Sequence, residues 1–254
     1  MSFKDWLFTN YPAASKVQPW GVLHILTLVL CIAAIVGIAL CLRNKSKKAK
    51  RILLWVLVGL ILFFEIARRV INLINLSNWT LNNVLYMLLP RPWCAISCWA
   101  LIIAAIFKKR FLYNFASISA LLCAIIFFAY PGVGFKSPYL LFDDLYSIVT
   151  HALLLITSIS LITLGFTEFR YKKFWKVALC FVVLFAYAFL EIYVLKIEAD
   201  PLYFMPGNDI IEIFGFSHGL YLIIYTAFLL LFVNLFFIIN EAKRKNARTK
   251  NLKN

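Results

Sequence analysis

Long runs of apolar residues alternate with short polar segments along the chain. Most runs hold roughly 20 residues or more, and about 20 helical residues at about 1.5 Å rise span the hydrocarbon layer of a bilayer. The pattern therefore predicts seven transmembrane helices. Their expected bounds are Trp20 to Leu42, Ile52 to Leu73, Val84 to Phe107, Phe111 to Tyr130, Leu145 to Phe166, Phe174 to Leu195 and Ile213 to Asn240.

The segments outside the apolar runs divide the chain into three expected regions. Residues 1–19 mix polar and aromatic side chains without an uninterrupted apolar core, which indicates an outer interfacial segment and not a cleavable signal peptide. Residues 20–240 form the predicted seven-helix transmembrane domain. Residues 241–254 form a basic tail.

The composition supports the same class of protein. Hydrophobic residues make up 63% of the 254 positions and charged residues 15%, with a mean hydropathy of +0.87. A soluble domain is about half apolar and about a quarter charged. These values exclude a water-soluble globule and predict an all-α, polytopic bundle in the cell membrane.

The net charge of +15 is gathered in a few places. Four segments hold 19 of the 26 basic residues: 43–51, 108–110, 169–176 and 243–254. They fall on one side of the predicted bundle, so the positive-inside rule places the C-terminus in the cytoplasm and the N-terminus outside. We interpret the charge as an orientation signal that also attracts phospholipid head groups, and we expect no nucleic-acid partner.

Several ionisable residues lie inside the apolar runs, where an ionisable side chain costs several kcal/mol unless it faces the protein interior or water. Seven of them fall in the outer half of the bundle or near its middle, on five of the predicted helices. They are His24, Glu65, Arg68 with Arg69, His151, Glu191 and His218. This convergence predicts a polar pocket that opens to the outer leaflet. A simpler interpretation also stands: Glu65 pairs with the arginines three and four residues on, and each histidine makes one interhelical hydrogen bond.

The third apolar run contains the sequence LLPRPWCAISCW, residues 88–99. Pro90 and Pro92 remove hydrogen-bond donors and clash with the preceding turn, so the helix is expected to break there and to restart with Pro92 at its first position. Cys94 then lies in the first turn, beside unpaired N–H groups that stabilise negative charge. These groups, or Arg91, are candidates to hold an oxyanion.

The six cysteines do not indicate a disulfide framework, because all lie within or beside apolar runs. Filling apolar space is the expected role of Cys31, Cys41, Cys123 and Cys180, and an open alternative for Cys94. Cys94 and Cys98 with a histidine would make a zinc site, but this spacing alone is weak support. We expect no metal and no soluble cofactor.

Four motifs in order resemble the YwaF-like family of bacterial seven-helix membrane proteins. They are PWGVLH at 19–24, FFEIARRV at 63–70, LPRPWC at 89–94, and YPGVGFKSPYLLFDDLYSIVTHALLL at 130–155. The resemblance implies a seven-helix fold. Its eukaryotic relatives look like acyltransferases that pass a fatty acyl group between phospholipids through a cysteine acyl-enzyme. Pro92 stands where the family usually has a histidine.

The hypothesis drawn from these features is acyl transfer on a phospholipid or lipid-modified substrate at the outer leaflet. Cys94 is the expected nucleophile, His151 the general base, and His24 and Glu65 the assisting groups. Expected substrate-binding residues are Arg68, Arg69, Arg91, Glu191 and His218. Two alternatives remain: a lipid or small-solute transporter, and a non-enzymatic membrane protein that docks a partner.

Overall fold

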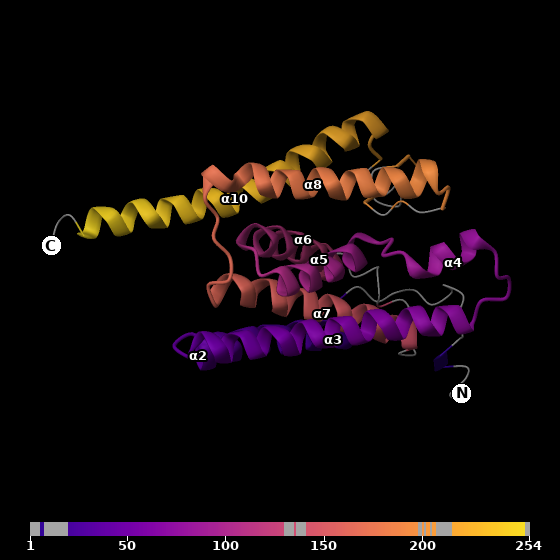
Figure 1. Ribbon diagram of the computed structural model, residues 1–254, viewed down its shortest axis with the longest axis horizontal. Helices are drawn as coiled ribbons and strands as arrows, with labels where there is room; N and C mark the ends of the chain where they lie inside the picture. The colour runs from indigo at the N-terminus through magenta and orange to yellow at the C-terminus, as the bar shows by residue number, and fades with distance from the viewer. Residues whose placement is uncertain are drawn as a thin grey trace. The chain divides into compact units, whose positions relative to one another are not determined.

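A computed structural model of the chain is drawn in Figure 1. It describes residues 6–7, 20–129, 135, 141–197, 200, 202–203, 205–206 and 215–251, with side chains of the last helix described to residue 244. Across these residues the regular structure is helical, as predicted. The elements are α2 (Val22–Leu42), α3 (Lys47–Ile74), α4 (Leu81–Leu88), α5 (Trp93–Phe107), α6 (Arg110–Ala129), α7 (Phe142–Thr163), η1 (Tyr171–Lys173), α8 (Phe174–Phe189), η2 (Leu190–Val194) and α10 (His218–Asn251).

The number of candidate membrane spans differs from the seven predicted. Among the described residues five helical stretches are long and apolar enough to cross a bilayer, and the bent pair α4–α5 makes a sixth if it counts as one span. The difference lies in α3, which carries basic residues up to Arg51 at one end of its apolar stretch and Glu65, Arg68 and Arg69 at the other. Charge, and not length, separates α3 from the other spans. The chain is a multi-pass membrane protein.

The chain divides into two compact units, Met1–Phe166 and Thr167–Asn254. In the first unit α6 packs against α5 and α7, while α3 contacts α4, α5 and α7, and α2 contacts α7 (Figure 1). In the apolar stretch of α6, 67% of the residues are buried, and in that of α2 only 6% are. The core of the first unit therefore lies along α6, and α2 forms one of its edges.

Small residues let α5 and α6 approach closely. Ala116 and Ala120 of α6 are fully buried, and Ser119 between them meets α5. The Ser119 hydroxyl accepts a hydrogen bond from the Trp93 indole N–H at 2.8 Å and lies 2.7 Å from the Ser97 hydroxyl. In a membrane, where apolar burial contributes little, close packing and interhelical hydrogen bonds of this kind hold helices together.

The break predicted at the prolines is present. Helix α4 ends at Leu88, helix α5 starts at Trp93, and the two axes differ by 63°. Leu89, which precedes Pro90, is extended with ψ 146°, as a residue before proline prefers. Pro92 was expected at the first helical position of the restarted helix but is its N-cap, so α5 begins one residue later, at Trp93. Cys94 lies in the first turn.

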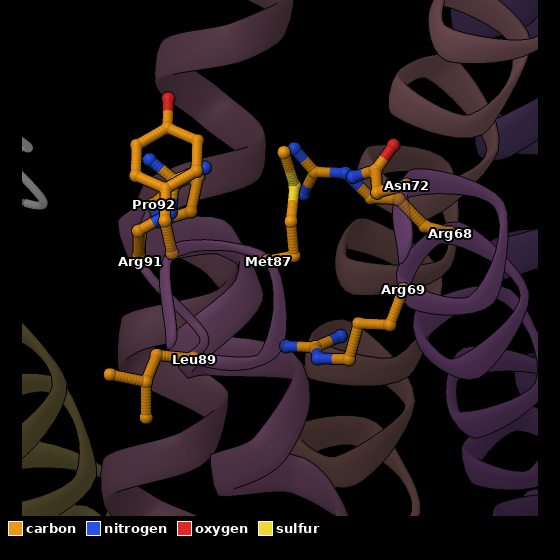
Figure 2. Close-up of a pocket in the computed structure, with 8 residues that line it drawn as sticks. Arg68, Arg69, Asn72, Met87, Leu89, Arg91 and Pro92 are labelled. Atoms are coloured by element: carbon orange, nitrogen blue, oxygen red, sulfur yellow. The ribbon is translucent and has the colours of Figure 1, made fainter. Parts of the chain in front are cut away.

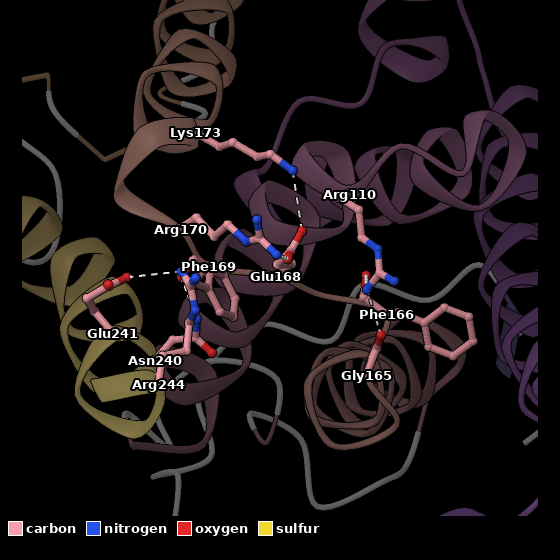
Figure 3. Close-up of polar contacts among 10 residues, drawn as sticks. All are labelled: Arg110, Gly165, Phe166, Glu168, Phe169, Arg170, Lys173, Asn240, Glu241 and Arg244. Atoms are coloured by element: carbon pink, nitrogen blue, oxygen red, sulfur yellow. Dashed lines mark hydrogen bonds and ion pairs between the residues drawn. The ribbon is translucent and has the colours of Figure 1, made fainter. Parts of the chain in front are cut away.

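An arginine of α6 forms hydrogen bonds with the segment that follows α7. The Arg110 guanidinium donates to the carbonyl oxygens of Gly165 at 2.8 Å and Phe166 at 3.2 Å (Figure 3). Gly165 has a φ of +79°, a conformation that glycine adopts readily and that ends helices. The arginine thus gives a hydrogen-bond donor to two carbonyl groups of the loop that follows α7.

The second unit is described by itself. The Phe169 ring contacts Phe237 of α10 at 5.5 Å between centroids. The Asn240 amide donates to the Phe169 carbonyl at 2.6 Å (Figure 3). Glu168 pairs with Arg170 and with Lys173 of η1. Although partial burial acts to raise the pKa of Glu168, the hydrogen bond from Lys173 and the charge of Arg170 together lower it. These contacts tie η1 and the preceding loop to α10.

Candidate functional site

The first unit contains a buried carboxylate, that of Glu65 on α3, whose side chain has no exposed surface. The Arg69 guanidinium, one turn further along α3, lies 2.5 Å from one carboxylate oxygen. The Tyr146 hydroxyl of α7 donates a hydrogen bond to the other oxygen. Arg69 also donates from Nε to the Leu88 carbonyl at the end of α4, at 2.9 Å. The Glu65 side chain thus connects α3, α4 and α7 through polar contacts.

A second guanidinium lies beside this group. Arg68 of α3 stands over the Tyr146 ring at 4.9 Å from its centroid. Its Nε atom is buried and has no hydrogen-bond partner among the described residues. The Asp143 carboxylate at the start of α7 is close enough to attract the Arg68 guanidinium electrostatically. Arg68 is therefore surrounded by Tyr146 and an acidic helix start, with donor capacity left over.

Cys94 is half-buried at the start of α5, within electrostatic range of the charges of Arg68 and Glu65. The backbone N–H groups of Cys94 and Ala95 interact with its sulfur atom. Cys98, one turn further on, is fully buried. As the sequence predicts, Cys94 lies in the first turn of a helix that restarts after the prolines.

An open pocket lies between α3 and the link from α4 to α5. The pocket is shallow, with room for about one water molecule. Figure 2 shows Arg68 and Arg69 projecting from α3 on one side and Arg91 lying on the other. The lining residues are Arg68, Arg69, Asn72, Tyr86, Met87, Leu89, Arg91 and Pro92. The three arginines that the sequence suggests for substrate binding thus line one pocket.

His151 of α7 is 8% exposed and lies on the core side of its helix. Its Nδ1 atom is 2.7 Å from the Ser147 carbonyl oxygen, an interaction in which Nδ1 must carry the proton. Its ring stacks on Phe127 of α6 with 3.8 Å between centroids. The charge of Arg68 acts on His151, so the histidine borders the Glu65 and Arg68 group. In this tautomer Nε2 is left as the basic atom.

His24 of α2 has different surroundings. It is 1% exposed and lies among the rings of Trp20 at 4.8 Å, Phe135 at 4.7 Å and Phe128 at 6.0 Å. Neither ring nitrogen has a hydrogen-bond partner among the described residues. Phe127 contacts both Phe128 and Phe135, so aromatic side chains connect His24 with His151. His24 borders the site through these rings and makes no described contact with the charged group.

Two predicted site residues belong to the second unit. Glu191 is buried in the π-helical segment η2, where it accepts a hydrogen bond from the Tyr187 hydroxyl at 2.9 Å. His218 is half-buried at the first position of α10. π-Helical turns inside longer helices frequently accompany functional sites. Of the residues between α6 and α7 the structure describes only 135 and 141, and those between η2 and α10 are described only in part.

Three residues of the site were not predicted from the sequence: Tyr146, Asn72 and Tyr86. Tyr146 is the second partner of Glu65, and Tyr86 lies under the Arg91 guanidinium at 3.0 Å from its ring centroid. A buried carboxylate requires a donor, but nothing local in the sequence shows which hydroxyl supplies it. Within the described part of the chain no group of three or more His, Cys, Asp or Glu side chains is arranged to hold a metal ion.

In comparison with known proteins, a family model described as the TMEM164 family covers residues 19–233. No curated protein and no solved structure matches the chain. The match overturns the resemblance to the bacterial YwaF-like family, and no support remains for a bacterial origin.

Proposed function

The chain belongs to the TMEM164 family, and we propose that it transfers fatty acyl groups inside the membrane, from a phospholipid to a second lipid or lipid-modified acceptor. The observation that carries the proposal is the position of Cys94. Its sulfur lies on the first turn of α5, half-buried, beside two backbone N–H groups and within range of the charges of Arg68 and Glu65. With a base to take its proton, a cysteine at this place is able to attack an ester and to hold the product as a thioester.

In the first half of the proposed reaction, Nε2 of His151 takes the thiol proton and the Cys94 sulfur attacks the ester carbonyl carbon. The first-turn N–H groups of α5 and Arg91 hold the negative charge that develops on the carbonyl oxygen. The ester C–O bond then breaks. The acyl group stays on sulfur, and the lysophospholipid leaves with the proton from His151.

In the second half, the hydroxyl of the acceptor attacks the thioester while His151 takes its proton. The S–C bond breaks, the acyl group passes to the acceptor oxygen, and the proton returns to the Cys94 sulfur. Glu65 and His24 are positioning residues in this scheme. Glu65 holds Arg69 and Tyr146, and His24 packs in the aromatic group that also carries His151.

The proposal includes a topology in which α3 is a seventh span. Glu65 and Arg69 neutralise each other at 2.5 Å, and the Tyr146 hydroxyl completes the carboxylate's contacts. A paired acid and base face the interior of a bundle at far lower cost than isolated charges. With α3 in the membrane, the basic segments place the N-terminus outside and the site in the outer half of the bilayer.

The test uses purified full-length protein in liposomes that contain an acyl-labelled phosphatidylcholine and an unlabelled lysophospholipid acceptor. We expect label on the acceptor and a hydroxylamine-sensitive thioester on the protein, detected by mass spectrometry. Cys94→Ala should remove both, and His151→Ala should remove transfer. Cys180→Ala, which changes another half-buried cysteine, is the matched control and should retain both. Transfer at the wild-type rate by Cys94→Ala would exclude covalent catalysis.

A second candidate is transport of a lipid or small solute, favoured by buried ionisable residues within the helices. Glu65, His24 and His151 are each at least nine-tenths buried, and such residues mark many proton and substrate pathways. Uptake into liposomes driven by a pH gradient, lost in Glu65→Gln and unaffected by Cys94→Ala, would select transport. Gradient-independent acyl transfer would reject it.

A further inference from the structure

His24 of α2 is a buried polar side chain to which the proposed reaction gives no chemical step. It is 1% exposed, and neither ring nitrogen has a hydrogen-bond partner among the described residues. A neutral imidazole has one N–H donor and one acceptor nitrogen, and leaving them unpaired away from water costs free energy. Thr27, the next polar residue of α2, differs, because its hydroxyl donates to the Leu23 carbonyl at 2.7 Å. The nitrogens of His24 therefore keep hydrogen-bonding capacity for a ligand.

The walls around His24 select the kind of ligand. Trp20 lies 4.8 Å from the His24 ring and Phe135 4.7 Å, while Phe128 of α6 stacks at 6.0 Å. The faces of aromatic rings carry partial negative charge, so they disfavour a phosphate or carboxylate beside the imidazole. A quaternary ammonium group suits such rings but has no hydrogen-bonding atom for the histidine. A neutral hydroxyl group satisfies both the rings and the nitrogens.

The surroundings favour a lipid hydroxyl over a water molecule. Leu23 and Ile25, on either side of His24 in the chain, are exposed apolar residues, and α2 is an edge of its unit. A buried water needs about two to four polar partners, and His24 offers any one water a single nitrogen. A hydroxyl carried on an apolar body makes its other contacts with hydrocarbon, which this lining provides.

We infer that His24 and the aromatic rings around it form a binding site for the hydroxyl group of a neutral lipid. Diacylglycerols and sterols are two bilayer lipids of this chemistry, and both hold the hydroxyl close to the membrane–water interface. Trp20, just before α2, is 52% exposed, and tryptophan side chains concentrate at that interface. His24 lies one turn further along the chain, at a depth that such a hydroxyl can reach.

Trp20 is the cover of this site. Its φ is +65°, a conformation that a bulky residue rarely adopts. Residues held in such conformations occur at ligand clamps, where the surrounding structure maintains them. Because Trp20 precedes the first residue of α2, Val22, its side chain can move without unwinding the helix. Movement of the indole would open His24 to the bilayer.

This inference goes beyond the proposed acyl transfer and does not depend on it. Phe127 contacts Phe128 and Phe135 on one side and the His151 ring on the other. A lipid at His24 is therefore separated from the proposed base by aromatic rings, and its binding uses no atom of Cys94.

The test compares lipids that differ only in the hydroxyl group. Full-length protein in maltoside detergent is titrated with dioctanoylglycerol and its methyl ether, and with cholesterol and its methyl ether. Native mass spectrometry gives the bound fraction of each. We expect one free lipid to bind about tenfold or more tightly than its ether, because the ether leaves a buried nitrogen unpaired.

Variants assign the preference to His24. His24→Phe keeps an aromatic ring and removes both nitrogens, so it should bind the free lipid and its ether equally. His24→Gln keeps a donor and an acceptor and should retain part of the preference. Thr27→Val is the matched control, because it removes a hydroxyl of the same helix that already has a partner. Trp20→Ala should speed dissociation of the lipid.

The outcomes separate the source of the hydroxyl and the two proposals. Preference for dioctanoylglycerol over its ether identifies a glyceride site, and preference for cholesterol over its ether identifies a sterol site. Equal affinity of the wild type for the free and ether forms of both lipids would overturn the inference, and so would an undiminished preference in His24→Phe. The wild-type comparison decides even where that variant fails to fold. Cys94→Ala should bind like the wild type, so a failure of acyl transfer leaves the binding result intact, and the reverse holds.

Discussion

The carboxylate of Glu65 uses both oxygens, one for Arg69 and one for Tyr146, in a place without exposed surface. We predict that Glu65→Gln lowers the free energy of unfolding by about 3–5 kcal/mol, because it leaves the Arg69 guanidinium with an uncompensated charge. Thermal or denaturant unfolding of the detergent-solubilised protein measures the change.

A double variant separates charge from packing. Glu65→Gln with Arg69→Gln removes both charges and should regain part of the loss. The control is Glu241→Gln, which breaks an exposed pair with Arg244 in which the side chains are 34% and 36% exposed. Such a pair contributes about 0–1 kcal/mol. Equal effects of Glu65→Gln and Glu241→Gln would show that the buried pair does not stabilise the fold.

Cysteine reactivity gives a second prediction at this scale. Cys94 is half-buried, whereas Cys98, one turn on, and Cys123 of α6 are 0% and 7% exposed. A small membrane-permeant maleimide should therefore label Cys94 faster than either, and Cys94→Ala should remove the fast phase. Peptide mass spectrometry at timed intervals measures the rates. Labelling of Cys98 ahead of Cys94 would be inconsistent with this arrangement.

Single residues differ in how far the sequence predicts them. The position of Cys94 could be predicted because proline acts on its own neighbours and determines where a helix starts. Tyr146 could not, because its hydroxyl meets a carboxylate 81 residues away in the chain. The apolar environment of His24 also depends on tertiary structure, since Phe128 reaches it from α6.

Among the elements, α5 and α6 share a buried hydroxyl that bonds two side chains. Ser119 accepts from the Trp93 indole and bonds Ser97 at the same time. We predict that Ser119→Ala costs about 1–3 kcal/mol of stability, because buried donors lose their acceptor. Unfolding measurements on solubilised protein give the value. Ser77→Ala, at an exposed serine, should leave stability unchanged, and an equal loss in both variants would contradict the prediction.

The count of spans shows where hydropathy reaches its limit. The apolar runs predict most helices to within a few residues, because a run of that length has little alternative in a membrane. The run 52–73 also forms a helix, but basic residues at one end and Glu65, Arg68 and Arg69 at the other separate it from the spans defined by hydropathy. Whether such a helix crosses depends on what its charges contact, and that information is not local.

The orientation of the whole molecule gives the last prediction. If α3 crosses the membrane, seven spans place the two termini on opposite sides, whereas six would place them on the same side. We expect an N-terminal epitope tag to be accessible from outside intact cells and a C-terminal tag only after permeabilisation. Ser46→Cys, at the start of α3, should resist an impermeant thiol reagent applied outside. Labelling from outside would reverse the orientation.

The contacts of α3 also affect how the protein is made. Synthesis is vectorial, so Glu65, Arg68 and Arg69 leave the ribosome before α5 and α7, the helices that α3 packs against. Until residue 146 has been added, the Glu65 carboxylate has Arg69 beside it but not the tyrosine hydroxyl. If α3 crosses the membrane, it is therefore inserted before all of its polar contacts exist. In that case we expect a substitution in α7 that removes the Tyr146 hydroxyl to lower the yield of inserted protein.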